Sequence, residues 1–276
     1  MSATRDAEQM VERPPLQARG WPGERIAGTL LVGLWAALGL GLVLHLISAW
    51  DPELFSRYGP FYLRGVGVTL TLVAISIVLG AVLSVPIAYA RMSNSRLLAG
   101  LAYAYVYFFR GTPLLAQTFL IYYGLGAFRL ELEAVGLWWF FREAWYCAIF
   151  AFSLNTAAYQ AEILRGAIES VGRGQWEGAT SLGLSRWQIM RKIVLPQALI
   201  VALRPYGNEI ILTIKGSAIV AIITVYDLMG ETRRAYSRTF DFQIYLWAAL
   251  IYLAMVETLR NVVEWIERRI TRHLKR

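Results

Sequence analysis

The chain contains a series of apolar runs long enough to cross a lipid bilayer. A transmembrane helix needs about 20 predominantly apolar residues, and polar or charged stretches separate the runs at regular intervals. The expected spans are 25–50, 62–90, 113–128, 144–165, a fifth beginning after Pro196, and 242–263. The pattern therefore predicts an all-α integral membrane protein with about six transmembrane helices.

One apolar run, 97–128, is interrupted near its middle by Arg110-Gly111-Thr112-Pro113. A charge at the bilayer centre is costly, and Thr-Pro is a helix-start signal, with Thr112 as the cap and Pro113 at the first helical position. We therefore expect 97–109 to lie at or in the cytoplasmic interface and the third span to begin at Pro113.

The spans divide the chain into four parts. We expect a cytoplasmic N-terminal tail (1–24), an extra transmembrane helix (25–50), a transmembrane domain (61–264) and a basic cytoplasmic tail (265–276). A short loop with Asp51, Glu53 and Arg57 should join the first two spans. The first span is longer than a signal-peptide core and lacks a small-residue cleavage site, which predicts that it is retained.

Composition and charge agree with a membrane protein. Hydrophobic residues make up 57% of the chain, mean hydropathy is +0.46, and the formal net charge is +8. The basic residues cluster beside the ends of apolar runs, at Arg91 and Arg96, at 186–192 and at 268–276, as the positive-inside rule describes. This distribution favours lipid over nucleic acid as the partner of the positive charge and predicts a multi-pass inner-membrane protein with both termini in the cytoplasm.

Spans four and five carry polar residues that must face protein or water, because lipid cannot satisfy them. Asn155, Tyr159 and Glu162 follow i, i+4, i+7 spacing and share one helix face. Candidate residues along a substrate path are Asn155, Tyr159, Glu162, Asn208, Glu209, Lys215 and Ser217. Asn155 is equally explained as hydrogen-bonding glue between helices, and an intramolecular pair between Glu209 and Arg204 would explain two charges without a substrate.

The stretch 174–199 is a polar, basic island between apolar runs. Its residues predict two short helices around a turn, with Gly183 ending the first helix in the left-handed conformation and Ser185 capping the second. Leu195-Pro196 should stop or restart the helix before the next apolar run. The island also keeps an apolar face on a water-exposed element, which usually marks a partner surface.

The spacing within this island resembles a known motif. Glu177-Gly178-Ala179, three residues, Gly183, nine residues, and then Ile193-Val194-Leu195-Pro196 are similar to the EAA loop of the membrane subunits of bacterial ABC importers. Gly178 replaces the first Ala of that pattern. The resemblance implies a coupling loop (174–196) that sits in a cleft of an ATPase subunit. Its coupling residues would be Trp176, Glu177, Gly178, Ala179, Gly183, Leu184, Leu195 and Pro196.

Other segments extend the resemblance to polar amino-acid permeases of this class, especially those for histidine, lysine, arginine and opines. These segments are RGTPLLAQTFLIYYGLG, NTAAYQAEI, RPYGNEIIL and ITVYDLM. The resemblance implies a five-helix type I ABC importer core, here with an extra N-terminal helix. It also implies an ATPase that binds ATP and Mg, a second permease subunit (a related chain or a copy of this one) and a periplasmic amino-acid-binding protein.

The sequence gives little support for catalysis, nucleotide binding or metal binding by this chain itself. The sequence contains no GxxxxGK[ST] phosphate loop, assembles no catalytic set, and has two His and one Cys, so we expect neither an enzyme, a cofactor nor a metal site. Three alternatives stay open: a permease for acidic or amide amino acids, an ion-coupled secondary transporter that uses Glu162 and Glu209, and a membrane anchor without transport.

Overall fold

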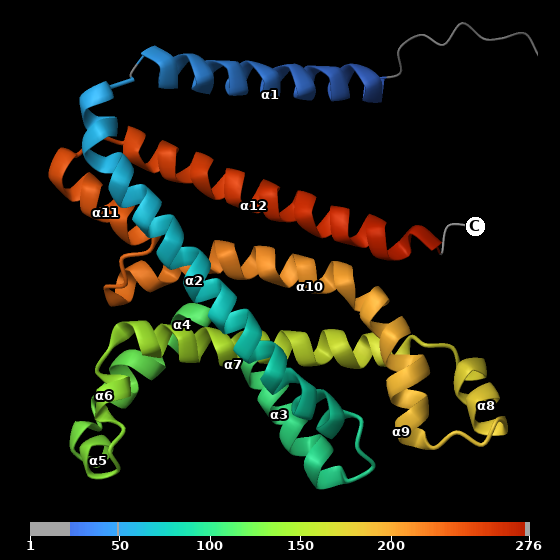
Figure 1. Cartoon of the computed structure of the whole chain (residues 1–276). Helices are drawn as coiled ribbons and strands as arrows, with labels where there is room; N and C mark the ends of the chain where they lie inside the picture. Colours follow the sequence, from blue (N-terminus) through green and yellow to red (C-terminus); the bar gives the residue numbers. More distant parts are fainter. Residues whose placement is uncertain (1–22, 49, 274–276) are drawn as a thin grey trace, which may run out of the picture. The chain divides into compact units, whose positions relative to one another are not determined.

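The computed structural model describes residues 23–48 and 50–273, and every regular element within them is helical (Figure 1). The all-α prediction is therefore confirmed. The chain divides into two compact units, Met1–Asp51 and Pro52–Arg276. Most of the predicted N-terminal tail and the last three residues of the predicted basic tail lie outside the described residues.

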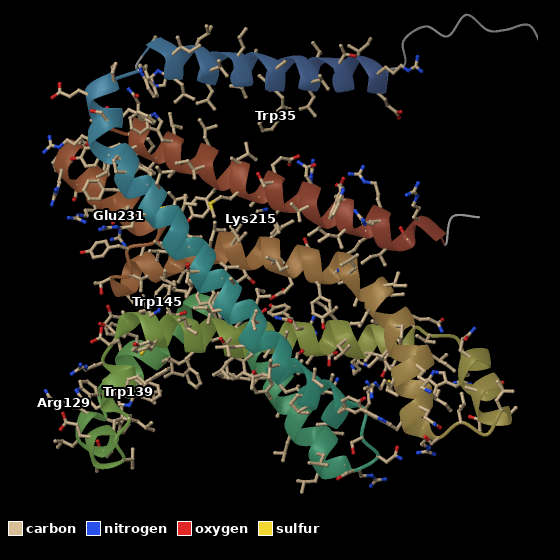
Figure 2. The ribbon with its side chains drawn as sticks, viewed as in Figure 1. Trp35, Arg129, Trp139, Trp145, Lys215 and Glu231 are labelled. Atoms are coloured by element: carbon tan, nitrogen blue, oxygen red, sulfur yellow. The ribbon has the colours of Figure 1, made fainter. Side chains whose placement is uncertain are left out.

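The first unit contains helix α1, Gly23–Ser48, which has no buried residue. Large apolar side chains are exposed along it, among them Leu30 and Trp35 (Figure 2). A helix that is apolar on all sides suits a lipid environment. The observed helix begins two residues before the predicted span, so Gly23 and Glu24 are helical and do not belong to a tail.

The second unit begins with α2, Pro52–Arg91, a helix of 40 residues. At 1.5 Å per residue it is about 60 Å long, roughly twice the hydrocarbon thickness of a bilayer. The predicted loop before the second span is wrong, because Glu53 and Arg57 are already helical. Pro52 fits a first helical turn, where its missing N–H costs nothing, and Glu53 favours that end of the helix dipole.

The next segment is a broken helix. It consists of α3 (Arg96–Gly111), α4 (Leu114–Phe119) and a π-helical turn (Leu120–Gly124), followed by the short helices α5 (Arg129–Ala134) and α6 (Trp138–Phe141). The break falls at the predicted motif, but the predicted capping is wrong by one position. Thr112 ends α3, since its N–H and hydroxyl both bond back to Phe108 O, and Pro113 is the residue before α4.

Helix α3 also reaches further than an interfacial helix would. Tyr105 Oη donates to Leu154 O, and Asn155 Nδ2 donates to Phe109 O. Leu154 and Asn155 lie near the middle of α7, Ala144–Glu169. The predicted interfacial position therefore does not fit the second half of α3, which runs alongside the midpoint of its neighbour.

Helix α7 is the centre of the second unit and contacts α2, α3, α4 and α10. Its closest neighbour is α2, which approaches at Gly80. A Cβ at Gly80 would collide with Thr156 Cγ2 and lie 2.9 Å from Gln160 Nε2. Glycine is therefore required for the two helices to pack at this distance.

The remaining helices complete the bundle. They are α8 (Arg173–Ser181), α9 (Arg186–Ile189), α10 (Leu195–Ser217), α11 (Leu228–Thr239) and α12 (Gln243–Ile270). Helices α8 and α9 lie at one end of the unit, and α5, α6 and α11 lie at the other (Figure 1). Because α12 continues to Ile270, much of the predicted basic tail is a helical extension of the last span.

Within the described residues, four helical segments are long and apolar enough to cross a membrane: Gly23–Ser48, Pro52–Arg91, Arg186–Ile223 and Gln243–Ile270. The third and fourth predicted spans differ from these. Leu114–Gly124 is apolar but short, and α7 has 26 residues with polar groups throughout its second half. Leu114–Gly124 and α7 both pack against other helices, so contacts with protein as well as burial in lipid hold them in place.

Replacing Gly80 with Ala should destabilise the protein by about 1–3 kcal/mol, because the added methyl group overpacks the α2–α7 crossing. Gly67→Ala on the same helix is the matched control, since a Cβ there meets nothing within 4 Å. The melting midpoint of the purified protein in detergent should fall for the first variant and stay level or rise for the second. Equal midpoints would contradict the close crossing.

Candidate functional site

The coupling-loop helices α8 and α9 form as the local sequence predicts. Gly183 has φ +75°, the left-handed conformation that ends α8. Gly183 N donates to Thr180 O and Leu184 N to Ala179 O, which is the Schellman arrangement. Ser185 and Gln188 form a reciprocal capping box at the start of α9. Both helix ends are thus fixed by short-range hydrogen bonds.

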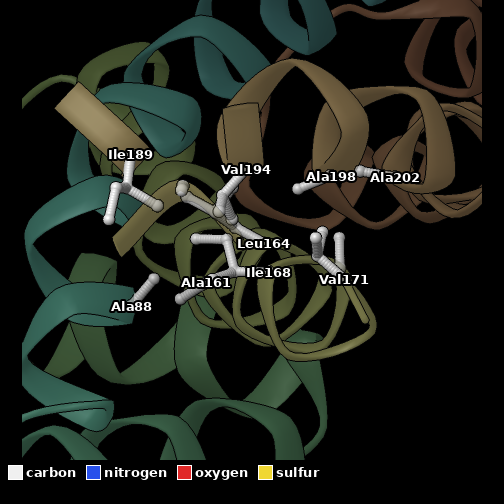
Figure 3. Close-up of a cluster of buried hydrophobic side chains, with 11 residues drawn as sticks. Ala88, Ala161, Leu164, Ile168, Val171, Ile189, Val194, Ala198 and Ala202 are labelled. Carbon is white, nitrogen blue, oxygen red and sulfur yellow. The ribbon is translucent and has the colours of Figure 1, made fainter. Parts of the chain in front are cut away.

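A cluster of buried apolar residues anchors these helices to the membrane helices (Figure 3). Ala179 of α8 and Ile189 of α9 are buried in one cluster with Leu164 and Ile168 of α7 and with Val171, which follows α7. Trp176 and Leu184 pack on the same cluster while partly exposed. Helices α8 and α9 are therefore fastened to α7 by closely packed side chains.

The opposite face of α8 and α9 is open. Leu182 is 80% exposed and Trp187 is 65% exposed, and Glu177 and Gly178 are also exposed. A Cβ at Gly178 would meet nothing within 4 Å, so the structure leaves room for the alanine that the EAA pattern has there. This face combines apolar and acidic groups that the rest of the chain does not cover.

The chain continues without interruption from α9 into α10. Met190–Val194 form a π-helical turn, and α10 begins at Leu195 with Pro196 in its first turn. The helix is uninterrupted at Leu195-Pro196, so neither the predicted stop nor the predicted restart is observed. The wider turn accommodates the proline, which lacks an N–H to donate. Leu195 is partly buried in the anchoring cluster and Pro196 is exposed.

A second polar centre lies where α3 breaks before α4, and we call it the α3–α4 junction (Arg110–Pro113). The break leaves backbone carbonyls without a hydrogen-bond donor in the helix. Side chains donate to these carbonyls instead. Gln117 Nε2 donates to Phe109 O (2.9 Å) and to Thr112 O (3.1 Å). From α7, Asn155 Nδ2 donates to Phe109 O (3.0 Å), and Tyr159 Oη donates to Arg110 O (3.5 Å).

Glu162 lies one turn further along α7 and gathers three arginines. Its carboxylate is 2.9 Å from Arg91 Nε of α2, 2.8 Å from Arg165 Nη2 and 4.0 Å from Arg110 Nη1 of α3. The Glu162 side chain is 14% exposed, whereas the Arg110 side chain is 45% exposed. One partly buried acid therefore ties three helices together, and Arg110 is its most distant and most accessible partner. Arg110 also lies over the Tyr159 ring.

Glu209 is buried between α10 and α7. Its Oε1 accepts a hydrogen bond from Thr156 Oγ1 at 2.9 Å, and Gln160 Nε2 donates to Thr156 Oγ1 and to Ile77 O of α2. The suggested ion pair between Glu209 and Arg204 does not form. Arg204 lies on another face of α10, where it pairs with Glu267 of α12 at 2.7 Å.

The other candidate path residues lie apart from the α3–α4 junction. Asn208 lines a groove between α10 and α12. Lys215 is exposed near the end of α10 (Figure 2). Ser217 is buried, and its hydroxyl donates to Ile214 O. The structure thus brings Asn155, Tyr159 and Glu162 together with the Arg110–Pro113 motif. Asn208, Lys215 and Ser217 do not join this group.

Several residues at these centres were not among the predicted site residues. Gln117, Thr156 and Gln160 are polar residues within apolar runs, and that signal was available. Arg91 ends α2, and Arg165 ends the predicted fourth span, so the positive-inside rule alone explains both. Only their short distances to Glu162 show that both arginines also form ion pairs with it.

The end of the unit opposite α8 and α9 contains a cavity of about 550 Å3 with charged walls. The charged lining residues are Arg64, Arg142, Glu143, Glu231 and Arg234, of which Glu231 is labelled in Figure 2. Glu231 pairs with Arg234 at 3.6 Å. Burial raises the pKa of Glu231, although Arg234 and Arg64 oppose the change. Among the described residues, no group of three His, Cys, Asp or Glu side chains could hold a metal ion.

Comparison with known families gives one match that covers most of the chain. Residues 76–272 match the family described as "Binding-protein-dependent transport system inner membrane component". The matched range includes α7, the α3–α4 junction, the coupling loop and α12, and it begins after α1.

Two curated relatives align with this chain over most of their own length. The nopaline transport system permease protein NocM of Agrobacterium fabrum is 45% identical over 219 residues, which are 78% of this chain and 91% of that protein. The arginine ABC transporter permease protein ArtM of Haemophilus influenzae is 35% identical over 218 residues, 79% of this chain and 95% of that protein.

Solved structures agree on the fold. A crystal structure of an amino acid ABC transporter with histidines superposes with a TM-score of 0.71 at 34% identity, covering 80% of this chain and 99% of that one. The MetNI methionine ABC transporter in an inward-facing conformation gives a TM-score of 0.63 at 21% identity, covering 76% and 96%. The second likeness concerns the fold alone.

Replacing Glu162 with Gln should destabilise the protein by roughly 1–3 kcal/mol, because partly buried arginines lose a charged acceptor. Glu169→Gln is the matched control, since Glu169 is more exposed and contacts one arginine, Arg165. The melting midpoint in detergent should fall clearly for the first variant and little for the second. A similar loss in both variants would contradict the central role of Glu162.

Proposed function

This chain belongs to the family of binding-protein-dependent transport system inner membrane components, and we propose that it is the permease subunit of an ATP-driven importer for a cationic amino acid or opine. The periplasmic binding protein delivers the substrate, and a second permease subunit, a related chain, completes the path. Family membership and the named relatives support this function over an ion-coupled transporter or an anchor without transport.

The observation that carries the proposal is the coupling loop. Helices α8 and α9 have an anchored face and an open face, and the open face includes Glu177 and Leu182. An ATPase subunit docks on the open face and binds ATP and Mg itself. Closure of the ATPases moves α8 and α9 as a rigid lever, and the anchoring cluster passes that movement to α7 and α10. ATP acts by favouring one conformer over another.

The substrate class is supported by the relatives and by the α3–α4 junction. NocM is named for nopaline and ArtM for arginine. A guanidinium or ammonium group on the substrate can compete with Arg110 for Glu162, because Arg110 is the most distant and most exposed of the three arginines. Tyr159 offers an aromatic ring beside the same position. The break between α3 and α4 also brings polar backbone and the side chains that bond it into the transmembrane unit, and broken helices are common at transport sites.

Orientation follows from the coupling loop. If α8 and α9 face the ATPase in the cytoplasm, the end of α12 is cytoplasmic too, because it lies at the same end of the unit (Figure 1). The charged cavity near α11 then opens toward the periplasm. In the predicted six-span arrangement four spans precede the coupling loop, and an even number of crossings puts the N-terminus on the cytoplasmic side as well.

ATP hydrolysis by the purified assembly in lipid nanodiscs tests the substrate class. We expect binding protein loaded with arginine, histidine or octopine to stimulate hydrolysis, because delivery of a substrate that fits the path favours the closed ATPases. Binding protein loaded with glutamate is the control. Stimulation by glutamate alone would leave an ABC importer but contradict the cationic substrate and the proposed role of Glu162.

Replacing Glu177 with Lys should abolish uptake while leaving the subunit inserted, because the change reverses a charge on the docking face. Gly178→Ala is the control on the same face, since it adds one methyl group in open space and favours the helix by about 0.5–1 kcal/mol. Uptake of radiolabelled substrate and the amount of subunit in the membrane should be measured together. Normal uptake by the Glu177→Lys variant would contradict docking at α8.

A further inference from the structure

A groove of about 810 Å3 lies between the coupling-loop helices and the turn that joins α2 to α3. We call it the turn groove. One wall is Met92, Ser93 and Asn94 from the turn, and the opposite wall is Trp176, Trp187 and Met190 from α8, α9 and the following π-helical turn. It adjoins the open face of α8 and α9: Trp187 belongs to both, whereas Glu177 and Leu182 do not line the groove.

The floor of the turn groove is apolar and firmly packed. Ile168 and Val171, at the end of α7, line it and also belong to the cluster that anchors α8 and α9. Tyr89 and Trp187 are exposed at its edges. Exposed aromatic side chains beside a polar, water-facing loop mark a protein contact more readily than a lipid contact.

The charged groups of the turn groove favour an acidic occupant. Arg173 and Arg186 line it, and neither has an ion pair among the residues that the structure describes. The lining acid, Glu169, is already bound to Arg165 at 2.6 Å. The groove is therefore lined by two arginines without an ion pair and by one acid that is already paired. Its net positive charge can be neutralised by an acidic group of a partner.

We propose that the ATPase subunit, in addition to docking on the open face of α8, inserts a segment with an acidic side chain and an apolar side chain into the turn groove. The proposal rests on the proposed function for the identity of the partner. Two observations favour that occupant: the groove is continuous with the docking face through α8 and α9, and its charge complements an acid. The ATPase then holds the coupling-loop helices on two sides.

This second contact has a direct route to the α3–α4 junction. The turn groove begins at Met92, and the preceding residue, Arg91, pairs with Glu162. Displacement of the turn therefore shifts a partner of Glu162, while displacement of α8 and α9 shifts the end of α7. The ATPase acts on both sides of the Arg91–Glu162 ion pair, so its closure can change the geometry of that pair.

Photo-crosslinking in the intact assembly tests the proposal. p-Benzoylphenylalanine at Asn94, which is exposed in the turn groove, should crosslink to the ATPase with a yield within about threefold of the same probe at Ser181 on α8. Leu130, which is exposed on α5 at the end of the unit opposite α8 and α9 (Figure 1), is the negative position. Mass spectrometry should place the Asn94 crosslink on an ATPase segment that contains Asp or Glu.

The outcomes separate this inference from the proposed function. A crosslink from position 181 without one from position 94 overturns the second contact and leaves the coupling loop intact. Loss of both crosslinks in an assembled complex overturns the ATPase docking itself. A crosslink from position 94 to lipid, to a second permease or to an ATPase segment without an acid also overturns the proposal.

Discussion

The second unit depends on one constraint, which is that the long polar side chains of α7 must find partners inside the protein; the small Ser153 hydroxyl is buried on α7 without one among the described residues. Hydrocarbon supplies no hydrogen-bond partners, and an unsatisfied group within it costs several kcal/mol. Asn155 bonds the broken end of α3, Thr156 bonds Glu209 of α10, and Glu162 binds arginines from α2 and α3. The polar residues of α7 therefore determine which helices surround it.

The same constraint explains why the break between α3 and α4 is stable. Free carbonyls at the break would be costly, but Gln117 and Asn155 donate to them from two directions. The junction is consequently a fixed polar site and not a flexible gap. A permease needs such a site, because a substrate with charged groups must meet compensating groups as it leaves water.

Coupling to an external partner requires the opposite property, a surface that is rigid but incomplete. Local hydrogen bonds at Gly183 and Ser185 fix α8 and α9, and Ala179 and Ile189 fasten them to α7. Their outer faces keep exposed apolar side chains such as Leu182 and Trp187. Rigidity on one side and exposure on the other allow a force applied by a partner to reach the polar centre of α7.

The sequence by itself determined the helical class, the break before Pro113 and the two coupling-loop helices. These features depend on residues within a few positions of each other, as at Gly183 and Ser185, so their physics is local. Tertiary structure decided which polar residues meet. The pairs Arg91–Glu162 and Arg204–Glu267 join residues 71 and 63 positions apart. Helix periodicity shows which face a side chain occupies, but only the packing of several helices decides which neighbour that face receives.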